Sequence, residues 1–326
     1  MQLKMTLKSC NKPRVTIGMP VFNGEKYLEE ALDAILAQTY QDYELIISDN
    51  ASTDNTPSIC RAYVSRDKRV RYYRNKENMG VVANFNRVFQ LSSTEYFKWS
   101  ACDDVIASDY LLKCIEILDA APSVALCHSR TGRINECGKL IGNYDVKLRV
   151  DSLKPHERFG DLICMSNDAW VLQYGLIRSD MLRMTQLFGR YIGSDRNLLA
   201  EIGLIGRFYI IPKLLFSRRE HSKSYTDNAD FKNYYEKLQW WFKTNSSKKT
   251  VFPHCKNCLE YFNSVGRMPL RWTERQLCYL QIVKWLAKEG WFYLGYDIGV
   301  NLIRSLRLEK KFKPLDEWLH RHVINR

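Results

Sequence analysis

The sequence predicts an α/β fold, doubly wound around a mostly parallel sheet. Short apolar or β-branched runs recur through the first 130 residues, and amphipathic helical stretches separate them. Strands that alternate with helices in this way pair in parallel, because each helix returns the chain to the same end of the sheet. The predicted strands are Arg14–Pro20, Tyr43–Ser48, Val70–Arg74, Tyr96–Trp99 and Val124–His128.

The helices between these strands are predicted from side-chain spacing. In Glu25–Thr39, the residues Leu28, Leu32 and Ile35 fall on one helical face. A second helix begins at Thr56–Pro57, because proline suits the first turn of a helix. The other two predicted helices of this part are Val82–Leu91 and Ser108–Ala120.

Composition narrows the class of protein. The 326 residues are 45% hydrophobic and 26% charged, which excludes a disordered chain or a small disulfide scaffold. The N-terminal residues lack the apolar core of a secretory signal, and no apolar run reaches the roughly 18 residues of a membrane helix. Ten irregularly spaced cysteines then indicate free thiols and a cytoplasmic location.

Positive charge is concentrated near the C-terminus. The formal net charge is +13, and residues 231–326 hold 18 Lys and Arg against 8 Asp and Glu, with six of the eight tryptophans. This shift predicts two regions, 1–228 and 229–326, the second being basic, Trp-rich and helical. Its predicted helices are Tyr234–Lys243, Cys255–Asn263, Thr273–Lys288, Trp291–Leu306 and Leu315–Val323, with Gly290 as a C-cap.

Two alternatives remain open for these helices. They either pack as a small helical core, or they lie on an anionic membrane surface as peripheral elements, and nucleic acid is the least favoured partner. Cys255 and Cys258 beside His254 have a spacing that zinc sites use, but no second pair follows. Two thiols packed on a helix are the simpler interpretation.

Polar residues follow the first, second and fourth predicted strands. They occupy Pro20–Glu25, Asp49–Asp54 and Ser100–Asp104, and the carboxyl ends of parallel strands meet at one edge, where ligands bind. Asp103 and Asp104 repel each other unless a cation intervenes, so they predict a divalent metal; the alternative is that one of them caps the next helix. No G-x-G-x-x-G or G-x-x-x-x-G-K-[ST] loop occurs.

Residues 14–130 resemble the nucleotide-binding half of family 2 glycosyltransferases, which have the GT-A fold. Three ordered segments, Val15–Thr56, Tyr72–Phe89 and Lys98–Leu111, carry the resemblance. It implies a GT-A catalytic domain over 1–228, with a nucleotide-binding half over about 14–130 and an acceptor half over about 131–228.

The resemblance implies a set of nucleotide contacts. The loop beside the base holds Pro20, Phe22, Asn23 and Glu25, and Asp49 accepts a hydrogen bond from uracil. Turn formation is a second role open to Asp49. Asp103 corresponds to the family's metal-binding aspartate, and Asp104 contacts metal or ribose. Ala101 replaces the first aspartate of the usual Asp-x-Asp-Asp pattern, which leaves the ribose contact without its usual partner.

The resemblance places the base of the reaction in the acceptor half. The resemblance points to Asp195, at the front of a helix within Gly193–Phe208, as the base that deprotonates the acceptor hydroxyl. The alternatives are that Asp195 is only an N-cap, or that Glu201 is the base. Trp170, Tyr174 and Gly175 are expected beside the donor or acceptor sugar, and the alternative for both aromatic rings is ordinary core packing.

Cationic side chains are expected at the diphosphate. Arg218, Arg219 and His221 would meet it through forked hydrogen bonds or through a metal, the alternative being a solvated basic loop. The metal, Mn²⁺ or Mg²⁺, would then have Asp103, Asp104 and His221 as ligands.

Together with these features, the resemblance implies an inverting, non-processive glycosyltransferase of hexosyl or N-acetylhexosaminyl type with a UDP-sugar donor. Met268–Trp272 comes close to the Gln-x-x-Arg-Trp motif of processive members but has Met in the first position, which favours single-sugar transfer. The expected acceptor is a glycan, lipid-linked or soluble, in bacterial surface polysaccharide or glycoconjugate assembly at the inner face of the cell membrane, with no nucleic acid partner. The alternative is a non-catalytic sugar- or membrane-binding protein; a nucleotidyltransferase fits less well, because a single glycine precedes Glu25–Lys26.

Overall fold

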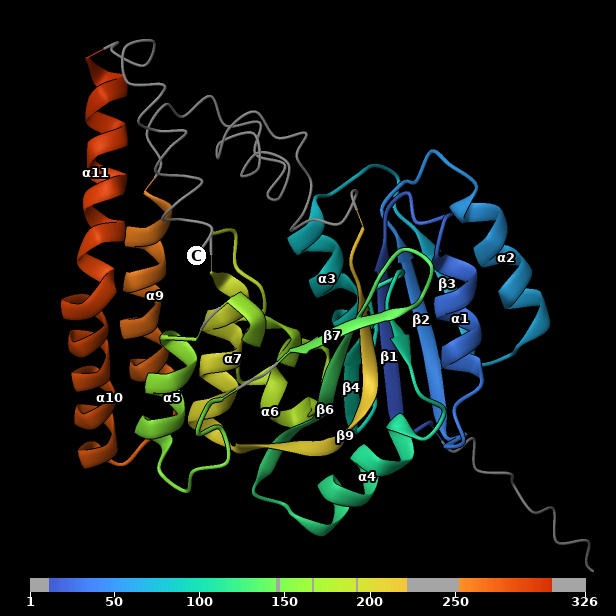
Figure 1. Ribbon diagram of the computed structural model, residues 1–326, viewed down its shortest axis with the longest axis horizontal. Helices are drawn as coiled ribbons and strands as arrows, with labels where there is room; N and C mark the ends of the chain where they lie inside the picture. The colour runs from blue at the N-terminus through green and yellow to red at the C-terminus, as the bar shows by residue number, and fades with distance from the viewer. Residues whose placement is uncertain (1–11, 145–146, 166, 192, 222–251, 307–326) are drawn as a thin grey trace, which may run out of the picture.

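The computed structural model describes residues 12–306 except 145–146, 166, 192 and 222–251 (Figure 1). The helices predicted at Tyr234–Lys243 and Leu315–Val323 lie outside the described residues.

One sheet of nine strands organises the described part of the chain. Its order is β3-β2-β1-β4-β8-β6-β9-β5, and β7 pairs with β6. Strands β3, β2, β1 and β4 run parallel, as predicted from their alternation with helices. The strands are β1 (Val15–Val21), β2 (Tyr43–Asp49), β3 (Val70–Arg74), β4 (Tyr96–Trp99), β5 (Val105–Ile106), β6 (Val124–Ile134), β7 (Leu140–Tyr144), β8 (Leu176–Arg178) and β9 (Arg207–Arg219).

The other half of the sheet is mixed, so the prediction of a mostly parallel sheet holds only for the first half. Strand β8 runs antiparallel to both β4 and β6, β5 runs antiparallel to β9, and β6 and β9 are parallel. Strand β8 has only three residues, too few to give a strand signal in the sequence.

Helices flank the sheet and form a layer of their own at the C-terminal end. Figure 1 shows α9, α10 and α11 at the left edge, next to α5 and α7. The predicted positions of α1 to α4 agree with the structure to within three residues at each described helix start. The helices are α1 (Leu28–Leu36), α2 (Thr56–Arg66), α3 (Val81–Gln90), α4 (Tyr110–Ala120), α5 (Pro155–Ile163), η1 (Asn167–Tyr174), α6 (Ser179–Arg183), α7 (Ser194–Ile205), α9 (Pro253–Arg267), α10 (Trp272–Trp285), η2 (Leu286–Gly290) and α11 (Trp291–Ser305).

The C-terminal helices share the hydrophobic core of the sheet region. Phe159 of α5, Tyr261 of α9 and Ile282 of α10 are fully buried and belong to the same apolar cluster as the strands. The packing alternative therefore holds for the inner faces of α9 and α10. No helix within the described ranges is both long and apolar enough to cross a bilayer.

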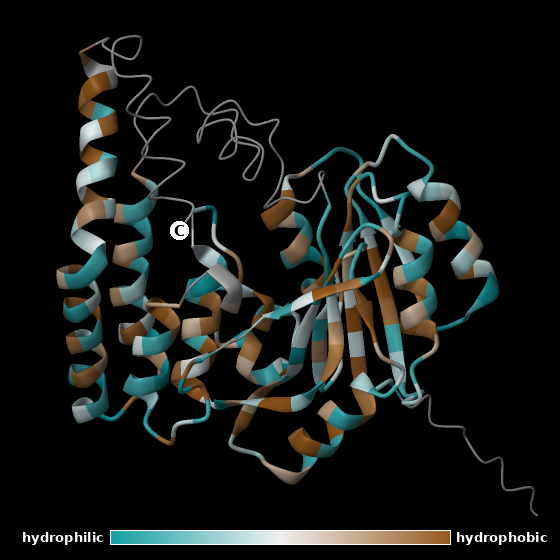
Figure 2. Ribbon diagram, viewed as in Figure 1, coloured by the Kyte–Doolittle hydropathy of each residue, from teal (hydrophilic) through white to brown (hydrophobic). Residues whose placement is uncertain are grey.

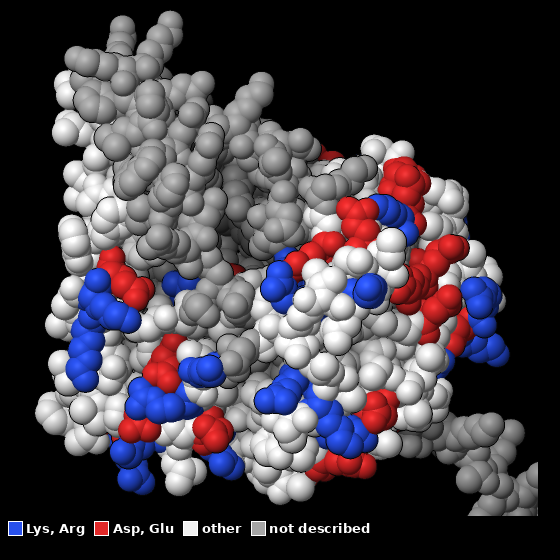
Figure 3. Space-filling model, viewed as in Figure 1, with Lys and Arg blue, Asp and Glu red and all other residues white. Residues whose placement is uncertain are grey.

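Charge on the described helices is more balanced than the C-terminal stretch as a whole. Residues 252–306 hold seven Lys and Arg against four Asp and Glu. On the face in Figure 3, both signs intermix over α5 and α10, whereas Asp and Glu gather on the side of α1 and α2. Much of the basic excess therefore belongs to residues outside the described ranges.

Gly290 does not end a helix, contrary to the prediction. It closes the π-helical turn η2, and α11 continues directly with Trp291 in helical conformation. A Cβ at position 290 would lie 2.8 Å from the Trp285 ring, so glycine is needed for close packing at this turn.

Asp297 is a buried carboxylate that joins α11 to α9. Only 2% of Asp297 is exposed, and it accepts hydrogen bonds from the backbone N–H groups of His254 (2.8 Å) and Cys255 (2.9 Å). Its other oxygen lies 2.8 Å from His254 Nδ1. The carboxylate thus satisfies the free donors at the start of α9. The nine cysteines of the described ranges are free thiols, as expected, and Asp297 already engages the histidine of the suggested zinc spacing.

Replacing Asp297 with alanine should lower the free energy of unfolding by about 3 kcal/mol, because two buried backbone donors lose a charged acceptor. Asp297→Asn keeps one acceptor and should lose about half as much. Urea denaturation followed by circular dichroism measures both. Equal stability of Asp297→Ala and the wild type would show that α9 does not depend on this cap.

Candidate active site

The loops that follow β1 and β2 are held together by hydrogen bonds. The Asn23 N–H donates to the Ser52 hydroxyl (2.9 Å), and the Thr53 N–H donates to Asn23 Oδ1 (2.8 Å). Glu25 accepts the backbone N–H of Asn55 (2.9 Å). Asn23 adopts a positive φ of 52°, which asparagine tolerates better than most residues. These two predicted nucleotide-binding loops therefore form one edge of the sheet, preceded by buried Pro20 in β1.

Asp49, the predicted uracil-binding residue, is fully buried at the end of β2. One oxygen accepts the Ser52 N–H (2.8 Å), and the other accepts the Tyr72 hydroxyl (2.6 Å). This is the turn role that the sequence left open. The neighbouring Phe22 is 38% exposed at the same edge and could offer its ring to a base.

Asp103 and His221 lie side by side at this edge, although 118 positions separate them in the sequence. His221 Nε2 is 2.9 Å from Asp103 Oδ2. Asp104, which is 6% exposed, accepts the backbone N–H of Arg219 (3.0 Å), which fixes the end of β9 against the aspartate loop. The ring of Tyr27 packs 4.9 Å from that of His221. Neither aspartate caps α4, whose N-cap residue is Asp109, so the capping alternative does not apply.

The carboxylates of Asp103 and Asp104 repel each other at this edge of the sheet. Burial raises the pKa of Asp104, and the charge of Asp103 raises it further. A cation between the aspartates would relieve this repulsion. Within the described ranges, no three His, Cys, Asp or Glu side chains gather as a metal site. Asp103 and His221 nevertheless fit an ion that takes its remaining ligands from phosphates and water, as Mg²⁺ does at phosphate-binding sites.

Arg219 has a different environment from the predicted one. Its side chain is 1% exposed and donates to the carbonyl of Asp103 (3.0 Å) and to those of Asn135 and Glu136 (both 3.2 Å), and it pairs with Glu30 (2.6 Å). In this arrangement the Arg219 side chain is engaged by the aspartate loop, by the carbonyls of Asn135 and Glu136 and by Glu30.

Arg218 is also largely buried. Its guanidinium lies 4.9 Å from the centre of the Trp170 ring and contacts Tyr144 and Glu220. The solvated-loop alternative therefore does not describe either arginine. Contact of Arg218 or His221 with a diphosphate stays a prediction.

The predicted sugar-binding residues differ in exposure. Trp170 in η1 is half-buried beneath Arg218, whereas Tyr174 is buried and its ring stacks on that of Phe216 at 5.8 Å. Core packing is thus favoured for Tyr174. At Gly175 a Cβ would lie 2.7 Å from Leu126 Cδ2 and 2.9 Å from the carbonyl oxygen of Cys127, so only glycine fits against β6.

Asp195 lies half-buried in the first turn of α7 and makes no side-chain capping bond to the helix. Gly193 is the N-cap residue, in the left-handed region at φ 76°, so the N-cap alternative for Asp195 does not apply. Glu201, the other candidate base, is fully buried and pairs with Arg267 (2.6 Å), which leaves it no access to an acceptor.

The first half of the chain is similar in sequence to known proteins. The family model described as "Glycosyl transferase family 2" matches residues 16–176. Residues 16–176 therefore belong to glycosyl transferase family 2. An uncharacterized glycosyltransferase of Haemophilus influenzae is 37% identical over 103 residues, which is 32% of this chain and 41% of that protein. Glycosyltransferase GlyG of Streptococcus pneumoniae is 33% identical over 97 residues, 30% of this chain and 32% of that one. The match thus spans less than half the length of these relatives.

Solved structures of similar fold extend over the rest of the chain. S. aureus TarS 1-349 in complex with UDP-GlcNAc has a TM-score of 0.58 at 13% identity and covers 84% of this chain and 73% of its own. Mannosyltransferase PcManGT from Pyrobaculum calidifontis, in complex with GDP-Man and Mn²⁺, has a TM-score of 0.53 at 16% identity and covers 97% and 83%. The predicted GT-A fold with a helical C-terminal region is confirmed.

A buried lysine near the candidate site was not predicted. Lys98 in β4 is fully buried, and its ammonium donates to the carbonyl oxygens of Trp99 (3.0 Å) and Tyr174 (2.6 Å). The rings of Tyr110 and Phe216 lie 5.0 and 5.2 Å away. Burial lowers the pKa of Lys98 to about 7. The sequence signal was a lone charged residue in the aromatic strand Tyr96–Trp99. Lys98 thereby ties the end of η1 to the strand that leads into the aspartate loop.

Lys98 should make the stability of the protein depend on pH. The folded chain releases this proton near pH 7, whereas the unfolded chain holds it to about pH 10. Between these values unfolding takes up a proton, so the wild-type free energy of unfolding should rise relative to that of Lys98→Met by about 1.4 kcal/mol per pH unit. Urea titrations at pH 7.5, 8.5 and 9.5 measure the difference. Lys76→Met, at an exposed position, is the control and should show no such slope. A constant difference for Lys98→Met would mean that the buried lysine stays charged.

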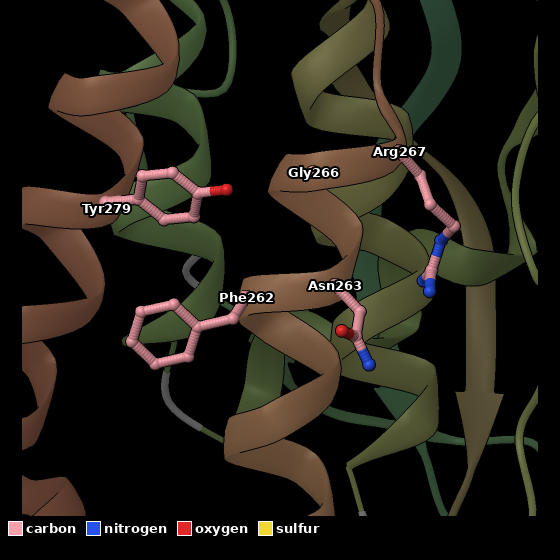
Figure 4. A pocket seen from close by; sticks show the side chains of 5 residues that line it. All are labelled: Phe262, Asn263, Gly266, Arg267 and Tyr279. Atoms are coloured by element: carbon pink, nitrogen blue, oxygen red, sulfur yellow. The ribbon is translucent and has the colours of Figure 1, made fainter.

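A pocket lies elsewhere, between α9 and α10. It has a volume of about 540 Å³ and is lined by Phe262, Asn263, Gly266, Arg267 and Tyr279 (Figure 4). Two of its rings, Phe262 and Tyr279, stack at 5.8 Å on one side of α9, and Arg267 points to the other side. None of these residues belongs to the cluster around Asp103, so this pocket is separate from the candidate site.

Proposed function

We propose that the protein is an inverting, metal-dependent glycosyltransferase that moves a single sugar from a nucleotide-sugar to a hydroxyl group of a glycan. The contact between Asp103 and His221 carries this proposal, because it brings two metal-binding groups to the sheet edge formed by the loops after β1 and β2. Membership of glycosyl transferase family 2 agrees with it.

The proposed reaction is a single displacement. Asp195 accepts the proton of the acceptor hydroxyl as its oxygen attacks C1 of the donor sugar. The bond from C1 to the phosphate oxygen breaks, and the nucleoside diphosphate leaves with the bonding electrons. Attack from the side opposite the leaving group inverts the configuration at C1.

The proposed metal ion and the cationic side chains would stabilise the negatively charged leaving group. Asp103 and His221, with Asp104 next to them, would hold Mn²⁺ or Mg²⁺, which neutralises charge on the departing diphosphate. Arg218 lies beside this cluster in β9 and would add a second positive charge. Met268 is buried at the end of α9, where processive members have a glutamine, and this supports transfer of one sugar.

UDP is the nucleotide we propose for the donor. TarS, which binds UDP-GlcNAc, supports it, and PcManGT, which binds GDP-Man with Mn²⁺, makes GDP the alternative to test. The sugar would be a hexose or an N-acetylhexosamine.

Slow transfer of the donor sugar to water tests the reaction without a known acceptor. The protein is incubated with UDP-GlcNAc, UDP-Glc, UDP-Gal or GDP-Man and Mn²⁺, and proton NMR follows the released sugar. An inverting enzyme should release the β-anomer first from the α-linked UDP-sugars. Early release of the α-anomer would contradict inversion. No release from any donor, together with undiminished binding, would favour a non-catalytic sugar-binding protein.

The acceptor we propose is a growing surface glycan on a lipid carrier, reached by peripheral binding to an anionic membrane at the inner face of the cell. The outer face of α11 supports this, since it exposes Trp291, Ile298, Leu302 and the following Leu306 at 58 to 64%. Apolar residues recur along this helix in Figure 2. Lys284 and Lys288 are exposed on the preceding helical turns and would meet anionic headgroups.

Sedimentation with lipid vesicles tests the membrane proposal. The full chain should bind vesicles of phosphatidylglycerol and phosphatidylcholine, and Trp291→Ser/Ile298→Ser/Leu302→Ser should reduce the bound fraction severalfold. Vesicles of phosphatidylcholine alone are the control for charge. Equal binding of the triple variant and the wild type would exclude α11 as the membrane contact.

A further inference from the structure

A layer of buried polar side chains lies between α7, which carries Asp195, and α9 of the C-terminal helices. Its centre is Glu201, which is fully buried on α7. Glu201 Oε1 accepts the Ser264 hydroxyl (2.8 Å) and an N–H of Arg267 (2.6 Å), both from α9. Glu201 Oε2 accepts the backbone N–H of Gln186 (2.9 Å). One carboxylate thus connects α7, α9 and the segment after α6.

The same layer reaches the beginning of α7. Ser264 Oγ lies 3.1 Å from Asn197 Oδ1, and Asn197 Nδ2 donates to the Tyr191 hydroxyl (2.9 Å). At Gly193, the N-cap of α7, an added Cβ would lie 2.9 Å from Asn257 Nδ2 of α9. Asn197 and Asn257 are 1% and 7% exposed. The first two turns of α7 therefore rest on α9, through the contact of Ser264 with Asn197 and the close approach of Asn257 to Gly193.

Only the Glu201 end of this ion pair is buried, because the Arg267 side chain is 31% exposed. Desolvation of the Glu201 carboxylate offsets part of the attraction, so the pair contributes little net stability compared with apolar packing. It does fix geometry, since a carboxylate and a guanidinium satisfy each other only in a narrow range of positions. An apolar interface between α7 and α9 would tolerate sliding by a fraction of a helical turn. The hydrogen bonds of the polar layer oppose such sliding, because they would break when the helices shift.

We propose that Glu201, held by Ser264 and Arg267, is a positioning residue that fixes α7 so that Asp195 stands at the correct place for proton transfer. The C-terminal helices are then part of the catalytic apparatus and not only a membrane contact. This inference rests on the proposed function, in which Asp195 is the base.

The matched pair of variants is Glu201→Gln and Glu260→Gln. Glu260 pairs with the same Arg267 (3.4 Å) and with Lys256 (2.6 Å), but it lies on α9 and does not reach α7. Glu201→Gln should lower kcat by about tenfold or more, because small displacements of a reacting group cost at least that much. KM for the donor and the Kd for the nucleotide should stay within about twofold. Glu260→Gln should match the wild type. If Glu201→Gln does not fold, Arg267→Lys keeps the charge but removes the guanidinium that contacts both Glu201 and Glu260, and it should show the same loss confined to kcat.

Wild-type kcat in Glu201→Gln, or an equal loss of kcat and nucleotide affinity, would overturn the proposal. Hydrogen–deuterium exchange of residues 194–205 provides a readout that needs no turnover. Glu201→Gln should lose protection in α7 and Glu260→Gln should keep it; unchanged protection in both would also overturn the proposal. If the wild type transfers no sugar while α7 still loses protection in Glu201→Gln, the proposed function fails and the structural coupling stands.

Discussion

Asp195→Asn is expected to lower kcat by about 10²- to 10⁴-fold, the usual contribution of a general base. Asparagine has nearly the same shape but cannot take the proton of the acceptor hydroxyl. The Kd for the nucleotide should stay within about twofold, since Asp195 lies on α7, outside the hydrogen-bonded cluster of Asp103 and His221. Release of the nucleoside diphosphate measures turnover, and calorimetry measures binding.

The matched control is Asp180→Asn. Asp180 likewise lies in the first turn of a helix, α6, where it is exposed and accepts the neighbouring Met181 N–H. It should keep wild-type turnover. If Asp195→Asn retains more than about half of wild-type kcat, far above what loss of a general base permits, another group must act as the base.

Asp103→Asn should weaken nucleotide binding in Mn²⁺ by about 10- to 100-fold, because a neutral amide is a poor ligand for a hard cation. His221 would then face an amide in place of the carboxylate 2.9 Å away. In EDTA the wild type and the variant should bind equally weakly. Titration calorimetry at one ionic strength measures all four combinations.

Asp109→Asn controls for loss of an aspartate in the same segment. Asp109 pairs with Lys113 at 2.8 Å on the surface and has no contact with the cluster around Asp103. Its nucleotide affinity should equal that of the wild type. An Asp103→Asn protein that still shows the full effect of Mn²⁺ would exclude Asp103 as a metal ligand.

The parallel half of the sheet could be predicted because its strands and helices repeat with clear periods. The same regularity placed Asn23, Asp49 and Asp103 at one edge, since the carboxyl ends of parallel strands coincide. The proximity of Asp103 and His221 could be predicted only from the resemblance to a family, because no local sequence pattern relates residues 118 positions apart.

What the sequence could not predict depends on burial. Arg219 was predicted to bind a diphosphate because arginine commonly does so. At the end of β9, however, its side chain is buried and donates a hydrogen bond to the carbonyl of Asp103. In the sequence Gly290 looks like a helix end. In the structure the helix continues through it, and the adjacent Trp285 ring explains why glycine is needed at this position. Glu201 looked like a second base until Arg267, 66 positions away, accounted for its charge.

Metal-dependent nucleotide binding is the central claim, and calorimetry of the wild-type protein tests it most directly. UDP, GDP, dTDP and CMP are each titrated with Mn²⁺, with Mg²⁺ and with EDTA. We expect a nucleoside diphosphate, UDP before GDP, to bind in the presence of metal and to lose most of its affinity in EDTA. Binding that is the same in EDTA, or no binding of any nucleotide, would contradict the account.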